Sequence, residues 1–164
     1  MKILLKNARI LTMENDQIIN GSLVVKDNRI AYIGNDFEKY GHFDRIIDCH
    51  QNLLMPGFKN AHAHSAMVFL RGKADDVNLQ DWLFKIVFPR EEKLIPSDIY
   101  HLNKVAYLEY VSGGITACFD HYFFPIESAR AAKDFGMRTL LLGTPDPNKK
   151  TIEDVKNIYY QLNN

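Results

Sequence analysis

Two histidines separated by a single residue, His62 and His64, form the pattern in this sequence with the clearest chemical potential. In a β-strand, residues i and i+2 point to the same face, so both imidazoles would lie on one side of the strand. Two neutral imidazoles at this spacing can bind Zn²⁺ or a similar divalent metal. Such a pair also arises by chance, so taken alone it leaves an incidental arrangement open.

Weaker candidates lie near other predicted elements. His121 follows a predicted strand, so it could contact a substrate beside the histidine pair or be an ordinary loop histidine. Arg71 could meet a substrate group or form a surface ion pair with Asp75 or Asp76, and the ion pair is favoured. Glu109 lies on an otherwise apolar predicted helix and is expected to make a structural hydrogen bond.

The first 55 residues predict a small antiparallel sheet that forms one layer of a β-sandwich. Short runs rich in β-formers alternate with turn-forming residues, at positions 3–5, 8–11, 22–25, 29–33 and 45–48. Asn20-Gly21 and Asp27-Asn28 are dipeptides typical of tight turns between antiparallel strands.

The pattern changes at Pro56-Gly57, where strands begin to alternate with amphipathic helices. We expect strands at 57–61, 115–120 and 137–142, and helices after Asn78, over 97–112, over 126–135 and after Thr151. Pro89 is expected to end the first helix, and Gly113-Gly114 the second. This alternation is typical of βα units around a parallel sheet.

A complete eight-stranded TIM barrel needs ~250 residues, so the second part of the sequence has room for only a few βα units. We therefore expect an α/β fold: a β-sandwich segment at residues 1–55, and an incomplete TIM-like (β/α) barrel of three βα units at residues 56–164. Three parallel strands leave an open edge, which favours pairing with a second copy and a homo-oligomer. A small, complete three-stranded α/β domain is the alternative.

Composition excludes several classes of protein. With 46% hydrophobic and 24% charged residues, the chain has the composition of a soluble globular protein. The formal net charge is +0, so no basic excess points to a nucleic-acid partner. Its longest apolar run, Ala66–Leu70, is too short to span a membrane. Two cysteines, Cys49 and Cys118, do not make a disulfide framework, and a cytoplasmic location is expected.

The residues around the histidine pair resemble a known family. Residues 54–64, LMPGFKNAHAH, combine a Pro-Gly turn, an asparagine and His-x-His, and resemble the first barrel strand of the amidohydrolase superfamily. Upstream, VKDNRIAYIG at 25–34 is similar to the N-terminal β segment of those enzymes. Downstream, residues 70–91 and 135–138 are similar to the aminohydrolase branch, which includes S-adenosylhomocysteine/methylthioadenosine deaminases and chlorohydrolases. The resemblance extends along nearly the whole chain but covers only the N-terminal portion of such an enzyme.

This resemblance implies a hydrolase that deaminates a purine-like or other heteroaromatic ring with a metal-activated water. His62 and His64 would be the first two metal ligands, with zinc or another divalent metal such as iron as the cofactor, one per complete site. Trp82 and Glu91 match positions that face the substrate, a small heteroaromatic molecule. Considered without the family, Trp82 fits core packing and Glu91 fits a solvated surface.

The family's remaining ligands and its acid/base glutamate belong to later strands, so no catalytic residue is assigned in this chain. Two histidines make half a site, because catalytic zinc takes three protein ligands and a water. The 164 residues alone are therefore expected to be inactive. Three alternatives stay open: hydrolytic dechlorination by the same water, a non-catalytic truncated chain that self-associates, and a small binding domain whose histidine pair is incidental.

Overall fold

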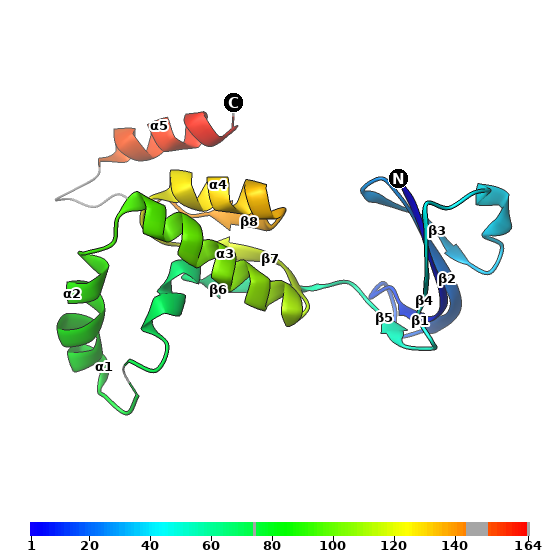
Figure 1. The fold of residues 1–164 in the computed structure, drawn as a ribbon, viewed down its shortest axis with the longest axis horizontal. Coiled ribbons are helices and arrows are strands. Elements are labelled where there is room, and N and C mark those ends of the chain that lie inside the picture. Colours follow the sequence, from blue (N-terminus) through cyan, green and yellow to red (C-terminus); the bar gives the residue numbers. More distant parts are fainter. Residues whose placement is uncertain (74, 144–150, 164) are drawn as a thin grey trace. The chain divides into compact units, whose positions relative to one another are not determined.

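A computed structural model of the chain describes residues 1–73, 75–143 and 151–163. The described chain divides into two compact units, Met1–Pro56 and Gly57–Asn164, which are considered separately. The first contains only strands and one short helix, and the second alternates strands with helices (Figure 1). Within these residues, no helix has both the length and the apolar character that crossing a membrane requires.

The first unit is a five-stranded sheet whose order is β3-β2-β1-β4, with β5 also paired to β1. Its strands are β1 (Lys2–Leu11), β2 (Ile18–Lys26), β3 (Arg29–Gly34), β4 (Arg45–Asp48) and β5 (Leu53–Leu54), and a 3-10 helix covers Glu38–Tyr40. Ala8, Ile10 and Leu23 are buried on one face, as the period of two in a strand predicts.

Two details of this unit differ from the sequence expectation. The sheet is mixed rather than antiparallel, because β4 and β5 both pair with β1 in parallel. Asn20-Gly21 is not a turn: it lies inside β2, opposite Arg9 and Ala8 of β1. A Cβ at Gly21 would come within 3.1–3.2 Å of atoms of Gly34 and Asn35. The glycine therefore lets these two residues lie close to β2. The expected turn at Asp27-Asn28 is confirmed between β2 and β3.

The second unit is built on a parallel three-stranded sheet in the order β6-β7-β8. Its strands are β6 (Phe58–Ala63), β7 (Ile115–Asp120) and β8 (Arg138–Leu141). The helices are α1 (Leu79–Asp81), α2 (Phe88–Glu91), α3 (Pro96–Ser112), α4 (Pro125–Phe135) and α5 (Ile152–Asn163), with a 3-10 helix at Ser65–Leu70.

One face of this sheet packs against helices α3 and α4 (Figure 1). The core between them contains Ala63 and Cys118 from the strands, Tyr107 from α3, and Ala131 and Ala132 from α4. Small residues on α4 let the helix approach the sheet closely. The parallel α/β arrangement expected for this part of the chain is therefore present.

Local signals explain most helix boundaries, with one exception at Pro89. The Asn78 side chain accepts a hydrogen bond from the Asp81 backbone N–H, as expected for an N-cap. The expectation that Pro89 ends this helix is wrong, because a π-helical turn over Trp82–Val87 leads directly into α2. Pro89 has no backbone N–H to donate to the π-helical turn that precedes it, yet the chain continues through it as helix.

Glycines end two of the helices in different conformations, which gives a matched test. Gly136 follows α4 with φ 82°, and an added Cβ would meet nothing within 4 Å, so only backbone strain opposes a side chain. Gly113 follows α3 with φ −88°. Gly136→Ala is expected to lower the free energy of unfolding by about 1 kcal/mol, whereas Gly113→Ala should change it little. Urea denaturation measures both, and an equal loss in the two variants would contradict this account.

Candidate metal centre

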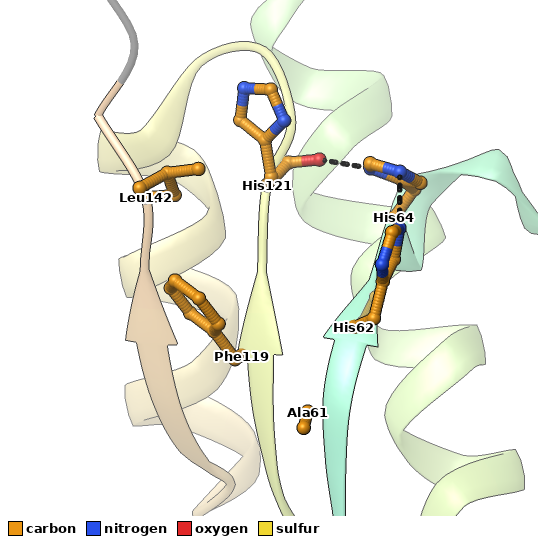
Figure 2. A pocket seen from close by; sticks show the side chains of 7 residues that line it. Ala61, His62, His64, Phe119, His121 and Leu142 are labelled. Carbon is orange, nitrogen blue, oxygen red and sulfur yellow. Dashed lines mark hydrogen bonds between the residues drawn. The ribbon is translucent and has the colours of Figure 1, made fainter.

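The pocket at the carboxyl end of the second unit's sheet brings the histidine pair together with residues from all three strands. It has a volume of about 190 Å³ and is lined by Ala61, His62, Ala63, His64, Phe119, His121 and Leu142. Figure 2 shows the rings of His62 and His64 converging at the end of β6, beside the end of β7. A pocket at this end of parallel strands is the usual location of sites in α/β folds.

The two imidazoles meet at the nitrogens that a metal would use. His62 Nε2 and His64 Nε2 are 3.2 Å apart. With Zn–N bonds of ~2.1 Å and tetrahedral angles, two ligand nitrogens are ~3.4 Å apart. The observed separation is close to this value, and it is also a hydrogen-bonding distance between the two rings.

The other nitrogen of His64 is fixed by the neighbouring strand. His64 Nδ1 lies 2.7 Å from the backbone oxygen of His121. A carbonyl oxygen can only accept, so Nδ1 carries the proton, and in the neutral ring Nε2 keeps its lone pair. Metal-binding histidines typically donate their second nitrogen in this way, which holds the ring and its tautomer.

Among the described residues, His62 and His64 are the side chains placed to bind one metal ion together. Within residues 1–73, 75–143 and 151–163, no group of three His, Cys, Asp or Glu side chains is placed to hold an ion. His121 borders the pocket, and its carbonyl oxygen meets His64 Nδ1 (Figure 2). The centroids of the His64 and His121 rings are 5.8 Å apart. The arrangement can hold a metal from one side and leaves the opposite side of the ion for other ligands.

A buried carboxylate supports the end of β6 from β7. Asp120 is 1% exposed, and its Oδ1 accepts a hydrogen bond of 2.9 Å from the backbone N–H of Ser65. Its Oδ2 has no hydrogen-bond partner in the part of the chain that the structure describes. Burial raises the pKa of Asp120 above its ordinary value. Sequence reasoning did not single out this carboxylate, although its place at the end of a strand was a signal.

The structure places Trp82 and Glu91 outside the residues that line the histidine pocket. Trp82 is partly buried at the start of the π-helical turn, and Glu91 ends α2. Glu91 Oε1 accepts a hydrogen bond of 2.7 Å from the Tyr122 hydroxyl, and Tyr122 directly follows His121. This bond links α2 to the residues after β7, and no local pattern in the sequence predicts it.

Arg71 has a different partner from the one expected. Its guanidinium donates two hydrogen bonds, of 2.7 and 2.6 Å, to the carboxylate of Glu109 on α3, rather than pairing with Asp75 or Asp76. The sequence neighbours were favoured because they are close along the chain, but folding brings α3 nearer. The expected structural hydrogen bond of Glu109 is confirmed.

The ion pair predicts a pH effect of defined sign. The hydrogen bonds from Arg71 lower the pKa of Glu109 below its ordinary 4.5. A carboxylate of this kind stabilises the fold above its unfolded pKa, and the contribution is lost as pH falls through the lower folded value. The melting temperature of the unmodified chain should therefore fall more steeply than that of Glu109→Gln on going from about pH 6 to about pH 3. Glu92→Gln, the same change at an exposed glutamate, should follow the unmodified chain. Parallel curves for all three proteins would refute the assignment.

Residues 53–159 match the model of the amidohydrolase family. A 5-methylthioadenosine/S-adenosylhomocysteine deaminase from Syntrophomonas wolfei is 40% identical, over 96% of this chain and 38% of its own. A 5′-deoxyadenosine deaminase from Methanosarcina acetivorans is 38% identical, over 85% of this chain and 32% of its own.

Solved structures show the same relation. An adenosine deaminase from Xanthomonas campestris with bound zinc superposes with a TM-score of 0.83 and 26% identity, over 98% of this chain and 38% of its own. The chain thus spans between 32% and 38% of the length of these relatives.

Proposed function

We propose a function from the premise that this chain belongs to the amidohydrolase family. His62 and His64 bind the metal of a hydrolase that removes an amino group from a heteroaromatic ring. The observation that carries this proposal is the 3.2 Å separation of the two Nε2 atoms, with His64 held by the His121 carbonyl. The relatives named as deaminases of adenosine-type compounds support the choice of reaction and substrate class.

Zinc is the metal we propose. Imidazole nitrogen is a good ligand for zinc, and the similar adenosine deaminase structure contains it. When bound, the metal would lower the pKa of its bound water to ~7, so that hydroxide is available at neutral pH. His62 and His64 provide two of the three protein ligands that catalytic zinc takes. The 164 residues alone are therefore proposed to lack turnover, and activity requires ligands from outside them.

Trp82, Glu91 and His121 are proposed to contact the substrate. The indole of Trp82 offers a flat face for a heteroaromatic ring, and the carboxylate of Glu91 can accept hydrogen bonds from hydroxyl groups. Tyr122 occupies Glu91 Oε1, which leaves Oε2 to meet a substrate hydroxyl. His121 lies at the pocket itself, where its ring can meet a polar group of the substrate.

We further propose that residues 56–164 form the first three βα units of a TIM-like barrel, and that residues 1–55 belong to a β-sandwich. Support comes from the sheet face opposite α3 and α4, where Phe119 is 38% and Leu140 66% exposed. These two residues pair across β7 and β8, so they form one apolar surface of the kind that fills a barrel interior. Two cysteines without a disulfide are in keeping with a cytoplasmic enzyme.

Deamination is favoured over hydrolytic dechlorination, although the same activated water serves both. The two curated relatives described above, at 40% and 38% identity, are deaminases. The likeness to a triazine hydrolase variant has a TM-score of 0.81 at 20% identity and concerns the fold alone.

The test uses a polypeptide that continues this sequence through the rest of the barrel. Ammonia release from 5′-methylthioadenosine, S-adenosylhomocysteine and 5′-deoxyadenosine is measured with zinc, after chelation, and after zinc is restored. We expect release from at least one compound, its loss on chelation and its recovery with zinc. Full activity in the chelated, metal-free protein would overturn the role of the histidine pair, and no release from any of the three by the zinc-loaded protein would overturn the substrate class.

A further inference from the structure

The segment that carries His64 is held to the end of β7 by three consecutive hydrogen bonds. The His121 N–H donates to Ala63 O at 3.0 Å, His64 Nδ1 donates to His121 O at 2.7 Å, and the Ser65 N–H donates to Asp120 Oδ1 at 2.9 Å. The first of these bonds joins two backbone atoms, and the second joins the His64 imidazole to a backbone oxygen. The third needs a side chain, and Asp120 supplies it.

The geometry of His64 makes this third bond important. His64 lies just beyond β6, with φ −127° and ψ 69°, and precedes the 3-10 helix Ser65–Leu70, whose Met67 N–H donates to His64 O at 2.8 Å. Its own φ and ψ belong to neither the strand nor the helix. The bond to Ser65 fixes the peptide that follows His64, and the bond to Ala63 fixes the residue before it. Both sides of the histidine are therefore held, which sets the direction of its ring toward His62.

Burial strengthens the constraint that Asp120 applies. The Ser65 side chain is 3% exposed and Asp120 1% exposed, so water cannot replace the carboxylate as acceptor without rearrangement. A buried N–H without a hydrogen-bond partner lowers the stability of the fold. This favours the arrangement in which the Ser65 N–H meets Asp120. Ser65 Oγ is in addition 3.1 Å from the Tyr110 hydroxyl, so the residue is held from α3 as well.

We propose that Asp120 is a positioning residue that sets the orientation and tautomer of His64 through the Ser65 backbone. This inference rests on the proposed function, because it gives His64 its role as a metal ligand. Its expected effect is a 10- to 100-fold weakening of metal binding when the support is removed, about the loss seen when partners of metal ligands are removed.

The experiment compares three variants of the 164-residue chain. Asp120→Leu keeps similar volume and removes the acceptor. Asp120→Asn keeps an oxygen that can accept from Ser65. Ser128→Ala is the matched control, since Ser128 is 2% exposed in the same unit and bonds Asn103 at 2.9 Å, away from the histidines. The tautomer of His64 is read in the metal-free proteins by ¹⁵N and ¹³C NMR of its ring, and zinc binding by competition with a chromophoric chelator.

The proposal expects a single Nδ1–H tautomer for His64 in the unmodified chain, Asp120→Asn and Ser128→Ala, and its loss in Asp120→Leu. A folded Asp120→Leu chain with the unmodified His64 signals would overturn it, and so would the same loss in Ser128→Ala. Should Asp120→Leu not fold, amide exchange of Ser65 in the unmodified chain decides: protection supports the bond, and exchange at the rate of an exposed loop overturns it. The NMR result is independent of zinc. Because the 164 residues hold two of the three protein ligands that catalytic zinc takes, weak zinc binding by this chain contradicts neither the proposed function nor the positioning test. The proposed function fails instead when the longer polypeptide keeps full activity without metal.

Discussion

Replacing His64 with alanine is expected to abolish tight zinc binding and to lower ammonia release by the complete enzyme about 10³-fold or more. The substitution removes one of two Nε2 atoms that lie 3.2 Å apart, so a single imidazole remains on this side of the ion. Under the proposed function, loss of the metal would leave no activated water at neutral pH and would remove several kcal/mol of transition-state stabilisation.

The control for this variant is His101→Ala. His101 is an exposed histidine on α3 that packs against the ring of Tyr100, so its removal changes the histidine count without touching the pocket. Zinc per chain is measured after dialysis, together with the rate of ammonia release and the far-ultraviolet circular dichroism spectrum. If the folded His64→Ala enzyme kept its zinc and its rate, the histidine pair would not be the metal site.

The second large effect concerns the stability of the helical layer. Ile99 is 0% exposed on α3, and Ile99→Ala is expected to lower the free energy of unfolding by about 2–5 kcal/mol through lost burial and the cavity left behind. Leu108→Ala on the same helix removes a side chain that is 60% exposed, and it should cost no more than about 0.5 kcal/mol.

Denaturant unfolding gives the loss of unfolding free energy in each variant, when the data are fitted with one common dependence of that free energy on denaturant concentration. Both variants replace an aliphatic residue of α3 with alanine, so the burial of the side chain is the main difference between them. Equal losses would show that α3 packs differently from the arrangement described, with Leu108 on the covered face.

Much of the second unit could be predicted because its signals are local. The strand at Ile115–Asp120 has the predicted bounds, and the helix ending at Ser112 is followed by the predicted pair of glycines. Capping and chain reversal depend on a few adjacent residues, which a sequence displays directly. Thr151 likewise accepts from Asp154 N–H at the start of α5, as an N-cap should.

Features set by distant residues could not be predicted in the same way. The parallel pairing of β4 with β1 depends on how the intervening chain returns, and the Arg71–Glu109 pair spans 38 positions. The histidine pair is visible in the sequence, but the carbonyl of His121 that orients it is a backbone atom that any residue would provide. Asp120 is separated by 55 positions from the N–H that it holds, so its role needs the fold.

The order of the strands in the second unit has a consequence for how the site is made. β6, β7 and β8 are neighbours in the sheet in the same order as in the chain, so every residue lining the histidine pocket comes from one continuous stretch. A chain break between β6 and β8 would therefore divide the residues that line the pocket, whereas a break within residues 1–56 would leave all of them on one piece.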